Sequence, residues 1–358
     1  MTTSQVTTQT LRSRVFSAIL SHCSLQELEI FADVPMVASL ARMDLKKRLS
    51  SVSLRELESL ADFPMAGPIA RTELKQRVGS LLNEKELNAD DTLRHMREWN
   101  VVMEGPAALQ VLMPECNGDR SLSFCCPRWG SMPFCQFLSS AGYSLKKRDD
   151  QTVEVPDDGR YNIHTGCIEV ITMGNGDGCT VTVCESVSMC PLVPIFFADS
   201  TASMNYVCAD GVACLYPDMT LNKTGFINYS RVFLDEDRQA GMAKYRANGF
   251  NILDTCEDAH THHDEGLQVT CQRRTRGIND RQVLMLPFTT SGFVPIRPFV
   301  RWRLGYNRRL DDGSLHEKDV MVSVEAEGGS FIEYNSNQPR FDLDDLLYRR
   351  LEPHFDEW

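Results

Sequence analysis

Short apolar strands alternate with short helices between residues 100 and 186, and this order constrains the fold more than any other feature of the chain. Short runs rich in β-branched and aromatic residues predict strands, and apolar residues at helical spacing predict helices. The predicted strands cover 100–105, 121–126, 143–148, 168–174 and 180–186, and the predicted helices cover 106–113 and 132–142. A mixed β-sheet flanked by helices accommodates this order.

A duplicated helical segment precedes this region. The segment 24–49 matches the segment 53–78, a spacing typical of helical repeat units. Ser24 and Ser53, each followed three residues later by a glutamate, form capping boxes that begin the first helix of each copy. The second helix of each copy should bury one stripe of small and apolar residues, Ala41, Leu45 and Leu49 in the first copy and Ala70, Leu74 and Val78 in the second.

The first copy, together with the helix before it, resembles an F-box, a three-helix module that docks on an adaptor protein of ubiquitin ligases. The matching elements in 14–49 are "AILSHCSLQEL", an apolar turn and a basic amphipathic third helix. The usual leading Leu-Pro pair is absent. The resemblance implies a partner contact through Leu25 and Leu28, and a role as the substrate adaptor of a ubiquitin ligase.

Residues 100–255 resemble nucleotidyltransferases of the DNA polymerase β type. They are more similar to an uncharacterised family of nucleotidyltransferase-like proteins abundant in mushroom-forming fungi, often preceded by an F-box-like segment. The matching segments follow in order at 105–112, 137–145, 199–207, 213–221 and 243–250. In active enzymes of this type a Gly-Ser pair begins a helix that binds the triphosphate, and a strand bearing Asp-x-Asp follows. These aspartates and a third carboxylate on a neighbouring strand hold divalent metals.

The positions that carry this chemistry are replaced in the present chain. Gly105 and Pro106 stand where the enzymes have Gly-Ser, and Ser121 and Ser123 stand where they have the two aspartates. The strand 180–186 offers threonines at the position of the third carboxylate. Hydroxyls are weak, neutral ligands for Mg²⁺. We therefore expect a degenerate nucleotidyltransferase, or pseudoenzyme, without catalytic residues, metal or cofactor, which acts by binding.

A second Asp-x-Asp pattern keeps an active, metal-dependent nucleotidyltransferase open as an alternative. Gly329 and Ser330 precede Asp342 and Asp344. Too few residues follow to supply the strand that must carry the third carboxylate. Apolar residues at helical spacing, with acids early and arginines late, instead predict an amphipathic helix over 342–351.

His260, His262 and His263 form a weak candidate metal site close to Cys256. Histidine and cysteine are ligands of transition metals. Their spacing matches no known ligand set, so a surface loop without metal is the favoured interpretation.

The segment 297–310 interleaves aromatic residues with arginines. Such mixtures can stack nucleic-acid bases. The chain carries a formal net charge of −12, however, which opposes binding to phosphates. We interpret the segment as a strand near a sheet edge, and we expect a protein partner, with a ubiquitin-ligase adaptor as one candidate, rather than nucleic acid.

The 13 cysteines include no Cys-x-x-Cys pair, and several lie in apolar runs, among them Cys125, Cys126, Cys208 and Cys214. We expect reduced thiols that serve as small core residues. No stretch approaches the about 20 apolar residues that span a bilayer, and the polar N-terminus is unlike a secretory signal. These features predict a cytoplasmic or nuclear protein without membrane contact.

The predicted fold class is α+β, with a helical N-terminal region followed by a nucleotidyltransferase-like mixed β-sheet flanked by helices. The expected division is a disordered tail at 1–9, a helical region with the tandem repeat at 10–98 and a nucleotidyltransferase-like domain at 99–290. A β-rich segment with a closing helix occupies 291–358.

Overall fold

The computed structural model describes residues 27–28, 30, 40–44, 66–116, 121–150, 152–154, 161–163, 165–229, 235–256, 271–289, 299–309, 315–326 and 330–335. Statements about the structure concern these residues. Most of the first repeat copy, the three histidines of the candidate metal site and the predicted C-terminal helix lie outside them.

Among the described residues, helices α5 and α6 lead directly into the sheet, and residues 40–44 before them are also helical. Helix α5 (Ala66–Asn83) contains the second helix of the second repeat copy, and its Ala70, Leu74 and Val78 are buried as predicted. Ala41, the counterpart of Ala70 in the first copy, is buried as well. Helix α6 (Ala89–Glu98) begins at Asn88, whose side chain accepts a hydrogen bond from the backbone N–H of Asp91 and so caps the helix.

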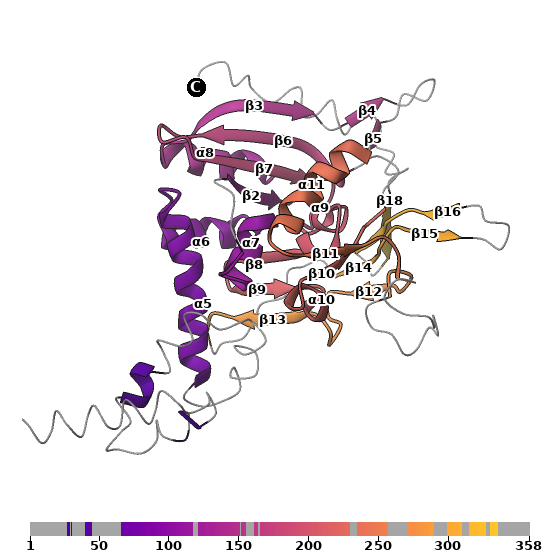
Figure 1. Cartoon of the computed structure of the whole chain (residues 1–358). Helices are drawn as coiled ribbons and strands as arrows, with labels where there is room; N and C mark the ends of the chain where they lie inside the picture. Colours follow the sequence, from indigo (N-terminus) through magenta and orange to yellow (C-terminus); the bar gives the residue numbers. More distant parts are fainter. Residues whose placement is uncertain are drawn as a thin grey trace, which may run out of the picture.

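Eight strands form one mixed sheet in the order β13-β9-β8-β1-β2-β7-β6-β3 (Figure 1). These strands are β1 Val102–Glu104, β2 Ser121–Cys126, β3 Ser144–Asp150, β6 Cys167–Gly174, β7 Thr180–Ser186, β8 Asn205–Cys208, β9 Gly211–Cys214 and β13 Leu284–Pro287. Within this sheet β2 and β7 run parallel, and the other neighbouring strands pair antiparallel. The prediction of a large mixed sheet in a mixed helix-and-strand fold is confirmed. The helices α7 (Gly105–Leu112) and α8 (Ser131–Ser140) and the strands around them begin and end close to the predicted positions.

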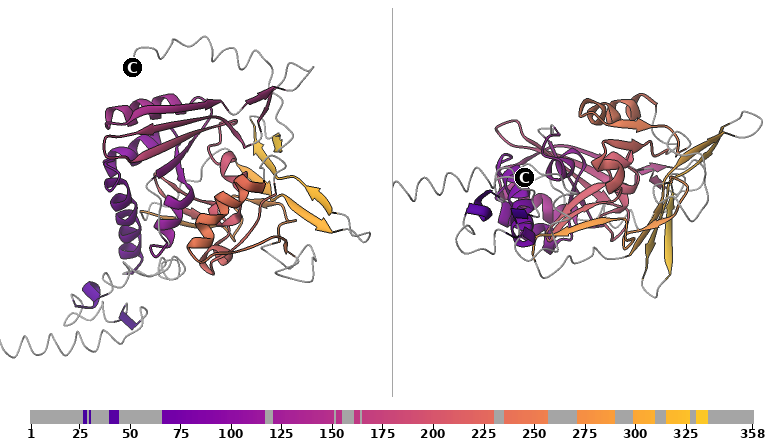
Figure 2. Two further views of the ribbon diagram at one scale, coloured as in Figure 1. Left: turned by 45° about the horizontal axis from the view of Figure 1, so that its top comes forward. Right: turned by 60° about the horizontal axis from the view of Figure 1, so that its bottom comes forward.

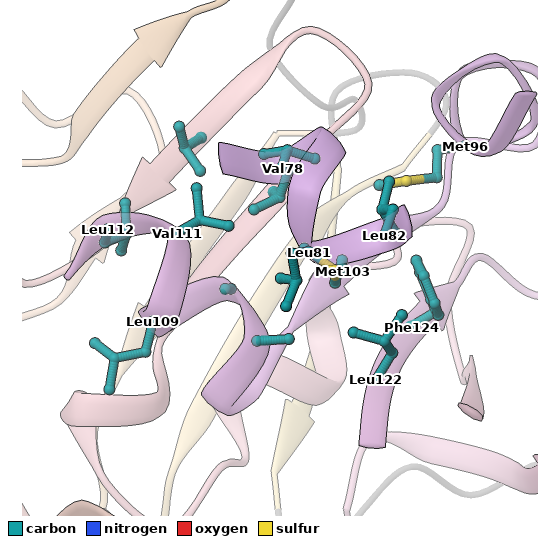
Figure 3. Close-up of a cluster of buried hydrophobic side chains, with 14 of the residues drawn as sticks. Val78, Leu81, Leu82, Met96, Met103, Leu109, Val111, Leu112, Leu122 and Phe124 are labelled. Carbon is teal, nitrogen blue, oxygen red and sulfur yellow. The ribbon is translucent and has the colours of Figure 1, made fainter. Parts of the chain in front are cut away.

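Helices α5 to α8 cover one face of the sheet. The core between them is continuous, because apolar residues at every second strand position meet the apolar stripes of the helices. Figure 3 shows part of this cluster, with side chains from α5, α6 and α7 packed over those of β1 and β2. Phe124 of β2 is completely buried and its ring lies 5.0 Å from that of Phe134 on α8.

The later part of the chain builds a second core on the opposite face. It contains α9 (Val193–Phe196) and a four-stranded sheet of β12 (Arg276–Gly277), β14 (Val300–Arg303), β17 (Met321–Glu325) and β18 (Phe331–Asn335). Trp302 lies at its centre, where its indole N–H donates to the Tyr216 hydroxyl at 2.9 Å. Figure 2 shows this sheet and helix α5 on opposite sides of the molecule.

Shorter elements connect these layers: β4 Thr152–Glu154, β5 Tyr161–Ile163, η1 Thr201–Ser203, α10 Pro217–Leu221, β10 Thr224–Phe226, α11 Asp235–Ala247, β11 Asn251–Leu253, β15 Tyr306–Arg309 and β16 Leu315–Lys318. The single strand predicted in 297–310 is divided into β14 and β15, which belong to different sheets, and β14 lies between β12 and β17. In β14 the aromatic Trp302 faces the core and the basic Arg301 faces solvent. Strands β12 and β14 pair with each other. One sheet therefore contains strands from both sides of residue 290, where the sequence predicts a boundary between two parts of the chain.

The cysteines show one departure from the prediction. Cys125, Cys126, Cys208 and Cys214 are buried as small core residues. Cys167 of β6 and Cys184 of β7, however, form a disulfide, with Cα atoms 6.1 Å apart. The prediction of reduced thiols is wrong for this pair, because antiparallel pairing of β6 and β7 brings both residues within disulfide distance.

In the part of the chain that the structure describes, no helix is both long and apolar enough to cross a membrane.

Candidate functional site

The face of β2 and β7 that points away from helices α5 to α8 carries hydroxyl groups. Their parallel pairing sets Ser121 opposite Thr180 and Ser123 opposite Thr182, and β6 adds Thr172 opposite Thr182. All five residues are partly exposed, while the residues between them on the same strands are buried. We call these five residues the hydroxyl face.

Helix α7 begins beside the hydroxyl face. Strand β1 ends at Glu104 and α7 starts at Gly105 without an intervening loop. Gly105 has a φ of 71°, a left-handed conformation that favours glycine, although space for a side chain is available there. Pro106 occupies the first turn, where its missing N–H costs no helical hydrogen bond. The sharp turn therefore explains both residues without a bound ligand.

Glu104 is a carboxylate of this site that the sequence interpretation missed. It lies opposite Ser123 in the pairing of β1 with β2, and the Ser123 hydroxyl donates a hydrogen bond to it. Burial raises the pKa of Glu104, and the hydrogen bond from Ser123 partly offsets this effect. The one signal in the sequence was an acid directly before the glycine that begins a helix.

Glu104 also changes what the start of α7 can bind. A helix N-terminus attracts anions, because its first N–H groups have no helical acceptor. Glu104 occupies the position that precedes α7, and it adds a negative charge of the protein itself there whenever its carboxyl group is ionised. Two like charges about 4 Å apart repel by about 4 kcal/mol near a protein surface. A triphosphate at this helix start would meet that repulsion whenever Glu104 is ionised.

Tyr245 and Asp199 are two further polar side chains near this site. Tyr245 of α11 is buried; burial raises its pKa, the negative charges of Glu104 and Asp199 raise it further, and a hydrogen bond with Ser203 lowers it. Asp199 lies so close to Gly241 of α11 that any larger residue at 241 would collide with its carboxylate. Within the described part of the chain, no three histidine, cysteine, aspartate or glutamate side chains are grouped so as to hold a metal ion.

Glu185 of β7 is a buried carboxylate on the opposite, helix-covered face. It accepts hydrogen bonds from the backbone N–H of Trp129 at 2.9 Å and from the Ser131 hydroxyl. Ser131 begins α8, so Glu185 holds the turn that leads into this helix. Its oxygens are directed at that turn rather than at the hydroxyl face, and its role is structural.

The structure brings some of the predicted site residues together, while others are buried or lie outside the described residues. Ser121, Ser123, Gly105 and Pro106 lie together around the end of β1 and the start of α7, joined by Glu104. Leu28 is completely buried, so it offers no surface to a partner in this conformation. Outside the described residues lie Leu25 of the F-box-like segment, His260, His262 and His263 of the candidate metal site, and Asp342 and Asp344 of the second Asp-x-Asp pattern.

Comparison with family models, with curated proteins and with solved structures finds no match to this chain. The resemblances to nucleotidyltransferases and to an F-box remain predictions from sequence motifs. The geometry of the site provides neutral hydroxyl donors and acceptors beside one carboxyl group of raised pKa. This set of groups can form hydrogen bonds, but it lacks the paired carboxylates that hold two metal ions.

Proposed function

We propose that the protein is a non-catalytic, nucleotidyltransferase-like protein that acts by binding a protein partner through the hydroxyl face. The observation that carries the proposal is the register of β2 with β7, which groups Ser121, Ser123, Thr180 and Thr182 on one partly exposed surface. The matching strand positions in an active relative would hold carboxylates. Here they hold uncharged hydroxyls.

Electrostatics argues against metal-dependent chemistry at this surface. A divalent cation needs several anionic oxygens to replace its hydration shell, and neutral hydroxyls provide no charge for this exchange. Glu104 is a single carboxylate, and burial favours its neutral form. The same residue opposes a triphosphate at the start of α7.

A protein surface suits these groups better. Serine and threonine hydroxyls donate and accept hydrogen bonds without carrying charge, so they can contact the backbone or polar side chains of a partner at little desolvation cost. The acidic balance of the chain, with a net charge of −12, disfavours nucleic acid as that partner.

Introducing aspartates at 121 and 123 tests whether these positions correspond to the metal-binding aspartates of nucleotidyltransferases. The double variant Ser121→Asp, Ser123→Asp should bind Mn²⁺ in calorimetry, whereas the natural chain should not. The control variant Ser139→Asp, Ser140→Asp adds the same charge on the exposed end of α8 and should not bind Mn²⁺. Release of pyrophosphate from any nucleoside triphosphate by the natural chain with Mg²⁺ would refute the non-catalytic assignment.

Site-specific photo-crosslinking tests the binding surface. A photoreactive amino acid at Thr180 of the full-length chain, expressed in its own cells, should give a discrete protein adduct. The same amino acid at Ser140, which is exposed but on α8, should not give that adduct. Equal adducts from both positions, or none from Thr180, would count against the hydroxyl face as the partner surface.

A further inference from the structure

A cavity lies on the helix-covered side of the sheet, between helix α8 and the strands β3 and β6. Its volume is about 240 Å³. The floor is formed by Ile171 and Met173 of β6, and one wall by Leu145 of β3. Met132 and Cys135 of α8 line the opposite wall.

The register of the sheet explains why this cavity is apolar. Leu145 pairs with Met173, and Arg148 pairs with Ile171, so these side chains share the face that α8 covers. Strand β3 is the last strand of the sheet as described, and Leu145 keeps 55% of its surface exposed. An apolar side chain with this exposure beside a hollow marks sheet surface that the described residues leave partly uncovered.

The single cation of the lining is already neutralised. The Arg148 guanidinium donates two hydrogen bonds to Glu169, one from Nε and one from an Nη at 3.1 Å. The Glu169 side chain is only 11% exposed. A ligand carboxylate that formed an ion pair with Arg148 in place of Glu169 would leave Glu169 as an uncompensated buried charge, which is strongly unfavourable.

The other ionisable groups of the cavity are neutral at physiological pH. Burial raises the pKa of the Cys135 thiol to about 12 and that of the Tyr143 hydroxyl to about 12. Tyr143 donates its hydroxyl proton to the backbone carbonyl of Lys85. Gln136, Ser139 and Ser144 complete the polar part of the lining and are uncharged.

Addition of a partner strand to β3 is a weaker explanation of this surface. Lys146 and Lys147 are exposed on β3, and its pairing with β6 is irregular between Leu145 and Lys147. Exposed lysines and bulges are the features that protect edge strands from pairing with other chains. The apolar cavity and the protected edge therefore favour a small molecule over an added strand.

We propose that the cavity between α8, β3 and β6 binds an uncharged, mainly apolar small molecule about the size of a single ring or of two fused rings. A concave apolar site with a few convergent polar groups is the usual form of a ligand pocket, and its modest volume sets the ligand size. The site is independent of the proposed function, because it lies on the helix-covered face and shares no residue with the hydroxyl face.

Methyl NMR of the methionine-labelled full-length chain tests the proposal with two matched probes, indole and indole-3-carboxylate. Indole should shift the methyl signals of Met132 and Met173 in a saturable manner, and it should leave Met103, in another part of the core, unchanged. The carboxylate should bind at least about tenfold more weakly, because it cannot pair with Arg148 without displacing Glu169.

Two neighbouring serines supply the matched variants. Ser139→Phe should fill the cavity and abolish the indole-dependent shifts, whereas Ser140→Phe, next in the chain but outside the lining, should bind indole within about twofold of the natural chain. The proposal is overturned by absence of saturable shifts, by equal binding of the carboxylate, or by unchanged binding in Ser139→Phe. It is also overturned if the two methyl signals respond to protein concentration instead of indole, which would identify a contact between copies of the chain.

Discussion

Strands β2 and β7 present two faces that differ in burial and in chemistry. On the helix-covered face their side chains are buried and, apart from Glu185, apolar, and they form the core with α5 to α8. On the other face Ser121, Ser123, Thr180 and Thr182 carry hydroxyls and remain partly exposed, whereas Cys125 of β2 is buried in the second core. Folding requires the first face to be apolar, because its burial drives the assembly of sheet and helices. It does not require hydroxyls on the second, which is the surface that we propose for partner binding.

The largest effect should come from the helix-covered face. Phe124→Ala removes a completely buried ring that contacts Phe134, and it should lower the free energy of unfolding by about 3–5 kcal/mol. Urea denaturation followed by circular dichroism measures the loss. The adjacent variant Ser123→Ala, on the hydroxyl face, should cost less than about 1 kcal/mol. Similar losses in both variants would erase the distinction between the faces.

Glu185 provides the next largest test, because it is a carboxylate on the buried face with a structural role. Glu185→Gln should cost about 2 kcal/mol, since charged hydrogen bonds to Trp129 and Ser131 are weakened at the start of α8. The matched variant Glu333→Gln, on the exposed strand β18, should be within about 0.5 kcal/mol of the natural chain. If Glu185→Gln left the free energy of unfolding unchanged, the carboxylate would not be needed for stability and would be available for a functional role.

Glu104 should make stability depend on pH. Because burial raises its pKa above the ordinary value of 4.5, the folded state holds this proton more tightly than the unfolded state. This contribution to stability is complete below pH 4.5 and is lost as the pH rises through the raised pKa. Glu104→Gln should remove that slope and stabilise the protein at pH 8 relative to the natural chain. Thermal unfolding between pH 4 and pH 8 measures the difference, and parallel curves would show that the pKa of Glu104 is not raised in the folded protein.

The smallest effect should come from a change confined to the hydroxyl face. Thr182→Val keeps the β-branched shape and removes one hydroxyl, so the free energy of unfolding should change by no more than about 0.5 kcal/mol. The same substitution should weaken the photo-crosslinked adduct formed from Thr180 if this hydroxyl contacts the partner. A large loss of stability would assign Thr182 to the fold and not to binding.

Much of the local structure could be predicted from the sequence. The alternation of Ser121, Leu122, Ser123 and Phe124 is a property of a short strand, and it places the two serines on one side without knowledge of the rest of the chain. The buried stripe of α5 follows in the same way from helical spacing. Such patterns depend on neighbours within one or two turns, which the sequence displays directly.

The relations between distant segments could not be predicted. The parallel register of β2 with β7 brings Thr180 and Thr182 beside the serines, and the disulfide of Cys167 with Cys184 depends on β6 lying next to β7. The pairing of β6 with β7 follows from the short turn that joins them, but the pairing of β2 with β7 leaves no local pattern. Glu104 was missed for the same reason, since only the pairing of β1 with β2 turns an ordinary acid at a strand end into a neighbour of Ser123.

The parallel pairing of β2 with β7 also has a consequence for the order of folding. Strands β6 and β7 are joined by a short turn, and β1, α7 and β2 follow one another directly, so both units can form from nearby residues. Pairing Ser121 with Thr180 instead requires closure of the long segment that contains α8 and β3. We expect the two units to gain amide protection early in pulsed hydrogen exchange, and the seam between β2 and β7 to gain it last. The surface that we propose for partner binding would then exist only in the fully assembled chain, and an incompletely folded copy would lack it.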